Sequence, residues 1–307
     1  MSGISGLLAV AVFVLTFVAP VQAQEREYTT IVPPDEVGDP QLPTTASTAF
    51  GINARGDIVG TFVEGGVQHG FLLSKGKFTV IDFPETPGYP KAEGTIARGI
   101  GPSGEIVGSY WLPGDNPMLA ARGFRRTKKG EFLNVRYGDP FPEHSWEIAQ
   151  RILPNGTILG CRHDTDQMAT MRGITIGKDG PSEIEAFGSM NNGATPDGNL
   201  IVGLWFNMMM NQQQGYTIEN GVFTPFTVPG SNFTAAWDVN ADGVIVGVFR
   251  VGTTFRGFAR SGESYTTIHY PGSAITRAFG INDSGDIVGN YVLGGVTYAF
   301  VARVVEE

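Results

Sequence analysis

The stretch GINARGDIVG at residues 51–60 returns as GINDSGDIVG at residues 280–289, with eight of ten letters unchanged. Four weaker copies lie between them, and each copy has a turn motif ending in glycine, an apolar run and a second glycine. The second glycines are Gly60, Gly108, Gly160, Gly203, Gly247 and Gly289, at intervals of 42 to 52 residues. A β-rich repeat of this length matches one four-stranded propeller blade. We therefore predict an all-β fold, a six-bladed β-propeller of four-stranded blades.

The repeat units extend approximately over residues 45–83, 94–137, 146–187, 189–228, 234–270 and 276–303. In the first unit we expect an inner strand at residues 48–52, followed by strands at 58–63, 69–74 and 78–83. Residues rich in Val, Ile, Phe and Thr, punctuated by 43 glycines, favour strands and turns over helices.

The two ends of the chain predict how the ring closes. The sixth repeat supplies only three strands, whereas the segment YTTI at residues 28–31 matches YTTI at 265–268, the expected fourth strand of repeat five. We therefore expect an N-terminal strand at residues 28–32 to complete the last blade, which leaves no open sheet edge there.

The turn motif itself is structural. In Asn53-Ala54-Arg55-Gly56 and its counterparts, the Asn side chain bonds the backbone that follows it, and Gly takes the positive φ at the exit of the turn.

The first 23 residues have the pattern of a secretory signal peptide. An apolar run from Leu7 to Val18 is followed by Val21-Gln22-Ala23, with small residues suited to cleavage after Ala23, although the usual basic segment before the run is missing. The alternative is an uncleaved anchor, but the run is short for a membrane span. We expect residues 24–307 to be a single secreted or periplasmic propeller, with no membrane span after cleavage.

Charge and cysteine content narrow the function classes. A formal charge of −9 disfavours binding to nucleic acid or anionic membranes. Cys161 is the one cysteine, so an internal disulfide is excluded. The equivalent positions in the other repeats hold small or medium residues, which favours a packing role for Cys161 over a catalytic one. The sequence also contains no Gly-x-Ser-x-Gly motif for a serine nucleophile.

Three tripeptides each follow an Ile-Val-Gly strand, at residues 69–71 (HGF), 256–258 (RGF) and 298–300 (YAF). They resemble the bacterial extracellular repeats named for a His-Ala-Phe signature. The resemblance covers nearly the whole mature chain, although repeats one, five and six fit it best, and it implies an exported repeat protein. It supplies no catalytic residues.

Function is sought where the repeats differ. If the inner strand leads each blade, the Asn-x-x-Gly turns share one face and the long, unequal loops share the other. The expected long loops are residues 33–46, 84–94, 112–121, 137–145, 162–171 and 207–214. We call the side with the long loops the loop face and the opposite side the turn face.

Repeat three departs most from the others. Arg162 replaces the aromatic residue found after Ile-Val-Gly-x elsewhere, and Arg151 replaces an inner-strand glycine, as Asp238 does in repeat five. The candidate catalytic residues are His144, Glu147, Arg162 and His163, which can supply acid, base and oxyanion partners. The alternative is an eroded repeat with a solvated loop.

A second set of candidates suits ligand binding: Trp111, Asp115, Asn116, Trp146, Asp164 and Asp166. Aromatic faces beside amides and carboxylates suit sugars. His163, Asp164 and Asp166 can also contribute to a divalent-cation site, but their spacing matches no named metal motif and we assign no metal ligands and no cofactor.

Two functions from different classes follow. The first is an exported binding module that recognises a polymer, such as a carbohydrate or cell-envelope component, or a protein, through the loop face. The second is a propeller lyase or hydrolase with an acid/base or metal-assisted site at the axial mouth near repeats two and three. Propellers host both, so the fold does not choose between them.

Overall fold

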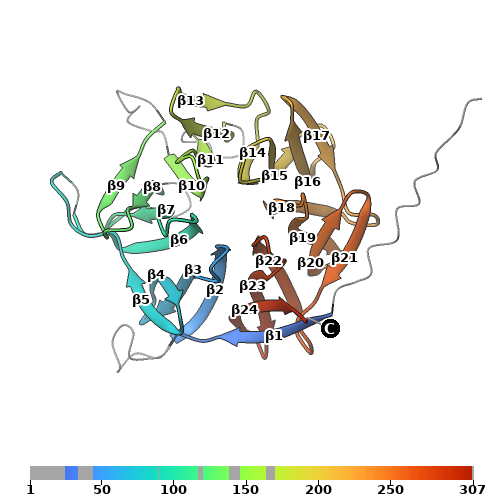
Figure 1. Ribbon diagram of the computed structural model, residues 1–307, viewed down its shortest axis with the longest axis horizontal. Coiled ribbons are helices and arrows are strands. Elements are labelled where there is room, and N and C mark those ends of the chain that lie inside the picture. The colour runs from blue at the N-terminus through green and yellow to red at the C-terminus, as the bar shows by residue number, and fades with distance from the viewer. Residues whose placement is uncertain are drawn as a thin grey trace, which may run out of the picture.

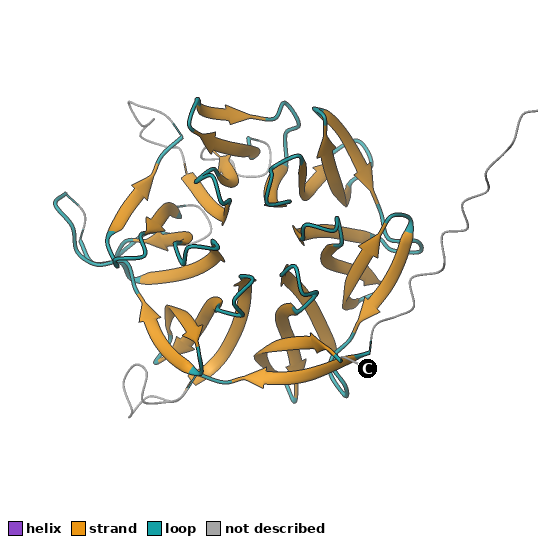
Figure 2. Ribbon diagram, in the orientation of Figure 1, coloured by secondary structure: helices purple, strands orange, loops and turns teal. Residues whose placement is uncertain are grey.

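The computed structural model describes residues 25–33, 44–88, 90–116, 120–137, 146–163 and 170–305. These residues form 24 strands and no helix, arranged as six blades around a central axis (Figure 1, Figure 2). The predicted six-bladed propeller is therefore confirmed. The predicted signal peptide, residues 1–23, lies outside the described residues. Within the described ranges, a search for helices that are long and apolar enough to span a bilayer finds none.

Each blade contains four strands. Blade one holds β2 (Thr44–Ile52), β3 (Ile58–Glu64), β4 (Val67–Ser74) and β5 (Lys77–Ile81). Blade two holds β6 (Gly94–Ile100), β7 (Ile106–Trp111), β8 (Arg122–Arg126) and β9 (Phe132–Val135). Blade three holds β10 (Trp146–Ile152), β11 (Ile158–His163), β12 (Arg172–Gly177) and β13 (Gly180–Glu183). Blade four holds β14 (Ser189–Ala194), β15 (Leu200–Asn207), β16 (Gln212–Glu219) and β17 (Val222–Phe226). Blade five holds β18 (Phe233–Val239), β19 (Ile245–Val251), β20 (Thr254–Ser261) and β21 (Ser264–Ile268). Blade six holds β22 (Ile275–Ile281), β23 (Ile287–Leu293), β24 (Val296–Val304) and β1 (Arg26–Ile31).

The first strand of every repeat lies innermost, as predicted. The inner strands β2, β6, β10, β14, β18 and β22 contact one another around the axis. Strands within a blade pair antiparallel, and a single parallel bridge between Gln213 and Phe233 joins blades four and five. Because neighbouring strands alternate in direction, the Asn-x-x-Gly turns share the turn face, and the connections between blades share the loop face.

Strand β1 closes the ring at the outer edge of blade six (Figure 1). Ile31 pairs with Ala299 and Tyr28 with Ala302, the same register in which β21 pairs with β20 in blade five. Ser47 of blade one accepts a hydrogen bond from Ala299 N (2.9 Å) and donates one to Ile31 O (3.2 Å). The predicted closure is thus present, and it also fixes blade one against blade six.

The second glycine of each motif allows close packing of the signature aromatic. A Cβ on Gly60 would lie 2.1 Å from Thr48 O and 2.6 Å from the Phe71 ring, and Gly108 and Gly247 face the same restriction. Phe71 is fully buried in a core cluster that joins Ile58 of blade one to Val288 of blade six. The hydrophobic core therefore lies between blades, and Phe, Tyr or Ile occupies this column in each repeat.

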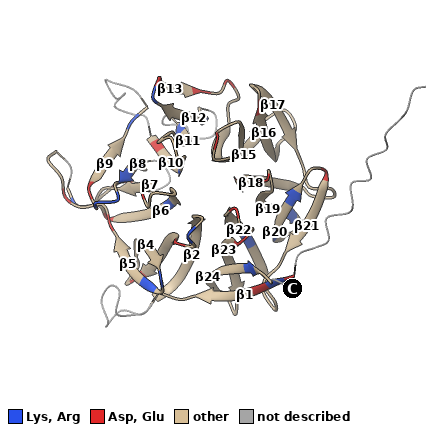
Figure 3. Cartoon of the chain, in the orientation of Figure 1, with Lys and Arg blue, Asp and Glu red and all other residues tan. Residues whose placement is uncertain are grey.

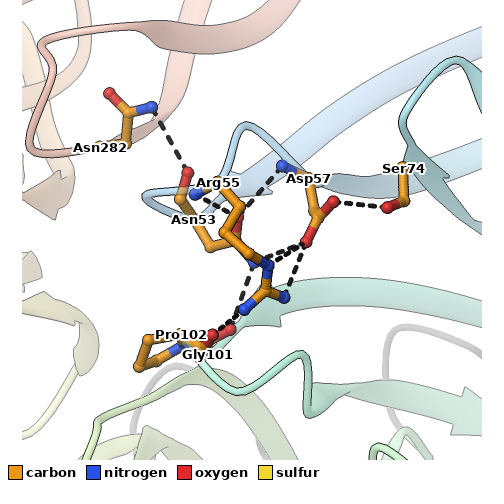
Figure 4. A network of polar contacts seen from close by, with 7 residues as sticks. All are labelled: Asn53, Arg55, Asp57, Ser74, Gly101, Pro102 and Asn282. Carbon is orange, nitrogen blue, oxygen red and sulfur yellow. Dashed lines mark hydrogen bonds and ion pairs between the residues drawn. The ribbon is translucent and has the colours of Figure 1, made fainter.

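The Asn-x-x-Gly motif has a second role besides the turn. Asn53 Oδ1 accepts hydrogen bonds from the backbone of Arg55 (3.0 Å) and Asp57 (3.1 Å), and the closing Gly56 has a φ of 77°. The Asn53 Nδ2 also reaches Gly101 O in the next blade (3.4 Å), and Asn282 Nδ2 reaches Asn53 O (3.4 Å; Figure 4). The motif therefore links neighbouring blades on the turn face as well as reversing the chain.

Candidate functional site

One column of the repeats separates blade three from the others. Each inner strand has an axial position, which is held by Gly51, Gly99, Arg151, Gly193, Asp238 or Gly280. Four residues before it lies a buried polar side chain that hydrogen-bonds the backbone of an adjoining segment. The column consists of Ser47, Thr95, Glu147, Ser189, Thr234 and Thr276. Thr95, Thr234 and Thr276 each accept a hydrogen bond at 3.0 Å, from the backbone nitrogens of Phe83, Val228 and Tyr270. Blade three thus places a carboxylate where the other blades use a small hydroxyl.

Glu147 keeps the structural contact and has one oxygen left over. Its Oε1 accepts a hydrogen bond from Tyr137 N, whereas its buried Oε2 has no partner within the described part of the chain. The residue is only 2% exposed. Burial raises the pKa of Glu147 to about 7, against the smaller opposing effects of Tyr137 N and the nearby Arg136 and Arg162. A proton can therefore be held or released here near neutral pH.

A cavity of about 30 Å³ adjoins Glu147 at the junction of blades two and three. Its lining includes Tyr110, Arg122, Asn134 and Arg136. This volume is enough for about one water molecule. The cavity is therefore too small for a sugar or peptide, and Glu147 lies at the base of the site.

Arg162 takes the place of an aromatic residue and reproduces its stacking. In blades two and six, Tyr110 stacks on Phe83 (3.8 Å between ring centroids) and Tyr291 stacks on Tyr270 (3.6 Å). In blade three the guanidinium of Arg162 lies 5.1 Å from the centroid of the Tyr137 ring. The charged Arg162 side chain thus replaces an aromatic ring and keeps a contact with the ring next to it, Tyr137, which argues against simple erosion of repeat three.

The Arg162 charge is neutralised by the outer strand of its own blade. Arg162 Nε lies 2.7 Å from Glu183 Oε2, and Arg172 pairs with the other oxygen of the same carboxylate. The guanidinium of Arg172 also lies 4.0 Å from the centroid of the Phe187 ring. Both arginines lower the pKa of Glu183, although its partial burial opposes them. The two arginines and one glutamate form a fixed network on the loop face.

A second network lies at the junction of blades two and three, where Arg122 meets Trp146. The Arg122 guanidinium lies 5.4 Å from the centroid of the half-buried Trp146 ring and forms an ion pair with Asp115. Asp115 is held in turn by Leu112 N (2.9 Å). Basic and acidic positions lie close together in this part of the ring, around β8, β10 and β12 (Figure 3). We call Asp115, Arg122, Trp146 and Glu147 the junction site.

The structure brings some of the predicted residues together. Glu147 lies opposite Arg162, and Trp146 lies opposite His163, in the pairing of β10 with β11. His163 is 5% exposed. Asn116 is exposed next to Asp115. Trp111 is 8% exposed because its indole covers Gly94, so little of its ring is open to a ligand.

His144, Asp164 and Asp166 fall outside the described residues, so their contribution remains a prediction. Among the described residues, no group of three His, Cys, Asp or Glu side chains is placed to hold a metal ion. Cys161 is fully buried and burial raises the pKa of its thiol to about 12, in keeping with a packing role.

Sequence reasoning missed Arg122, Tyr137, Arg172 and Glu183. The first and third occupy the His column of the repeat signature, in the triplets RGF at 122–124 and RGI at 172–174. An alignment of that column would have found them. Tyr137 and Glu183 carry no comparable signal, because their roles depend on how neighbouring strands pack.

The charged residues at the axis serve the architecture. Arg151 donates to the backbone oxygens of Phe50 (3.0 Å), Arg98 (2.8 Å) and Phe279 (2.6 Å), and its Nε lies 3.2 Å from Asp238 Oδ1. The pair links blades three and five, and its backbone contacts add blades one, two and six. Both residues line a cavity of about 190 Å³ on the turn face. Arg151 and Asp238 therefore interact with each other and with the backbone.

An apolar groove of about 410 Å³ lies on the loop face of blade four. It is lined by Phe187, Trp205 and the tip of the β15–β16 hairpin, where Met209 is 98% exposed. Trp205 Nε1 donates to Phe187 O (3.0 Å), so the ring is fixed and is only half-buried. Trp205 occupies the column that holds an aromatic residue after Ile-Val-Gly-x in most repeats, and it is only partly packed in the core.

No protein-family model matches the chain, and no curated protein matches it either. Several solved structures share the architecture. A fucose-specific lectin from Aleuria aurantia superposes with a TM-score of 0.52 at 10% identity, over 86% of this chain and 97% of the lectin. A gluconolactonase from Xanthomonas campestris gives a TM-score of 0.51 at 12% identity, over 92% and 96%. A putative TolB from Agrobacterium tumefaciens gives 0.51 at 14% identity, over 81% and 78%. At these identities the similarity establishes the propeller fold alone.

Proposed function

We propose that this protein is an exported propeller that binds a carbohydrate polymer at the junction site on its loop face. The observation that carries the proposal is the Trp146 ring, half-buried and fixed between blades, with the Arg122–Asp115 pair against it. An aromatic face stacks on the apolar face of a sugar ring, and an adjacent ion pair offers donors and acceptors to its hydroxyls.

Rigidity of the site favours binding. Arg122 is held by Asp115 and by Ala120 O (3.1 Å), and Asp115 is held by Leu112 N. Side chains that are ordered before the ligand arrives lose little conformational entropy on binding. Arg162 and Arg172, held by Glu183, add a second ordered polar network in the same blade as Trp146.

The Aleuria aurantia lectin, whose structure was determined with a fucose-containing disaccharide, gives an example of a six-bladed propeller that binds sugars. It supports the ligand class but identifies no residue of this chain. Export remains part of the proposal and rests on residues 1–23 and on the resemblance to His-Ala-Phe repeats. Amino-terminal sequencing of the protein secreted by its host should begin at Gln24.

The second candidate function is acid/base catalysis by Glu147, favoured by its pKa of about 7 and its unpartnered oxygen. Its 2% exposure opposes this role, because a substrate bond has to come within hydrogen-bond reach of the carboxylate. Binding is therefore the function that the geometry supports better.

The test is affinity electrophoresis of the protein in gels containing xylan, galactomannan, dextran or soluble peptidoglycan fragments. We expect at least one polymer to retard the parent protein, and Trp146→Ala to abolish the retardation. Trp205→Ala, which removes an aromatic from the same face in blade four, is the matched control and should be retarded like the parent. A parent that migrates freely in every gel, or a Trp146→Ala variant that is still retarded, contradicts the proposal. Release of reducing ends that disappears in Glu147→Gln would favour the catalytic alternative.

A further inference from the structure

The six inner strands carry a β-bulge at the same position, just before the axial residue. The residue inserted at each bulge contributes one member to a ring around the axis, which we call the axial ring. Its members, in blade order, are Phe50, Arg98, Gln150, Asn192, Trp237 and Phe279. The six repeats share the backbone bulge here, but their side chains differ, apart from the phenylalanines of blades one and six.

The axial ring has an aromatic half and a polar half. Blades five, six and one supply Trp237, Phe279 and Phe50, with ring centroids 4.9 Å apart for the first pair and 5.2 Å for the second. Blades two, three and four supply Arg98, Gln150 and Asn192. Phe50, Arg98 and Trp237 remain partly exposed although they lie on the innermost strands, whereas Gln150, Asn192 and Phe279 are buried.

Arg151 holds the backbone of the axial ring in place. Its guanidinium donates to the carbonyl oxygens of four ring members, namely Phe50, Arg98, Gln150 and Phe279. Arg151 therefore holds the backbone of the ring, and its charge is already neutralised by Asp238.

Arg98 is different, because no carboxylate partners it within the described residues. Its Nε donates to Ser109 Oγ (3.1 Å) and its guanidinium lies 5.4 Å from the centroid of the Phe50 ring. The charge of Arg151 repels it and lowers its pKa, whereas the thiol of Cys161 acts in the opposite direction. Burial lowers the pKa of Arg98 to about 10, so the side chain stays protonated at neutral pH. An enclosed cation without a counter-ion is unfavourable unless an anion reaches it.

We propose that the axial ring binds a small organic anion with a flat apolar body, its carboxylate on the Arg98 guanidinium and its body against Trp237. Arginine presents paired donors that match a carboxylate, and the aromatic half removes apolar surface from water. The site lies at the axis and shares no residue with the junction site, so it is independent of the carbohydrate-binding proposal.

Isothermal titration calorimetry at low salt tests the site with three probes of graded chemistry. Sodium benzoate has both the charge and the flat ring, benzamide has the ring without the charge, and sodium acetate has the charge without the ring. We expect benzoate to bind the parent protein at least about tenfold more tightly than either of the others, because each lacks one of the two contacts. Equal affinities for benzoate and acetate, or no benzoate binding at millimolar concentrations, overturn the proposal.

Variants then identify the residues. Arg98→Gln is expected to weaken benzoate binding about tenfold or more, since it removes a charge-assisted hydrogen bond. The matched control is Arg250→Gln, which removes an arginine of blade five that also lacks a carboxylate partner within the described residues and bonds Asn232 instead (3.1 Å). It should bind benzoate like the parent. Unchanged benzoate affinity in Arg98→Gln overturns the assignment.

Two further variants keep the test decisive if Arg98→Gln does not fold. Arg98→Lys retains the charge and should bind benzoate, whereas Trp237→Leu should bind benzoate no better than acetate. Benzoate should also quench the tryptophan fluorescence of the parent, and Trp237→Phe should bind benzoate without that quenching. A Trp237→Leu variant that still prefers benzoate to acetate contradicts the aromatic half of the site.

Discussion

Replacing Glu147 by threonine should make the protein more stable at neutral and alkaline pH. Thr95, Thr234 and Thr276 occupy the equivalent position in other blades and make the same backbone hydrogen bond. The substitution therefore retains the structural contact and removes a buried carboxylate that has one unpartnered oxygen.

The magnitude follows from the pKa of Glu147, about 7 in the folded protein against its ordinary 4.5. Between these values the folded chain holds a proton that the unfolded chain has released, so stability falls as pH rises through this window. A pKa difference of this size corresponds to about 3 kcal/mol in the free energy of unfolding, at about 1.36 kcal/mol per pKa unit. The parent should lose up to about that amount between pH 4.5 and 8 through this one group.

Urea unfolding at pH 5, 6, 7 and 8 measures the effect. We expect the free-energy difference between Glu147→Thr and the parent to grow with pH and to level off above pH 7. Glu147→Gln, which has nearly the same shape and no charge, should show the same pH dependence. Ser189→Thr, a change within the same column in blade four, should show none. A free-energy difference between Glu147→Thr and the parent that is constant across this range would refute the assigned pKa and the account of the column.

Three other predictions concern the architecture. Deleting residues 24–32 should lower the melting temperature by several degrees or cause aggregation, because it exposes the edge of β24 and uncovers the core around Ile31. An unchanged melting curve would rule out closure of the ring by β1. Gly285→Val should destabilise the fold by about 1 kcal/mol or more, because Gly285 has a φ of 81°, and a urea midpoint equal to the parent's would contradict this reading of the turn. Arg151→Met should lower the free energy of unfolding by about 3–5 kcal/mol, because it leaves Asp238 buried without its counter-ion. Burial already raises the pKa of Asp238, so acidification should protonate it and recover part of this loss. A loss that does not depend on pH would show that the pair contributes little.

The sequence alone was enough to predict the number of blades, the strand order and the closure by the N-terminal strand. A turn such as Asn53 to Gly56 and the apolar run after it are local features, and their six-fold recurrence fixes both the unit and the count. The divergence of repeat three was also visible and led to Glu147 and Arg162, whereas Trp146 was found among the aromatic residues near the loops.

Only the tertiary structure decided what these side chains do. Glu147 gains its raised pKa from burial between blades two and three, and Trp146 gains its cation–π partner, Arg122, from the neighbouring blade. The axial ring takes one residue from each of the six blades, so its aromatic half joins Trp237 and Phe279 to Phe50 at the other end of the chain. A repeat pattern reports the environment within one blade, whereas burial, charge pairing and cavities in a propeller arise between blades. That is why the fold could be predicted from the sequence and the chemistry of its sites could not.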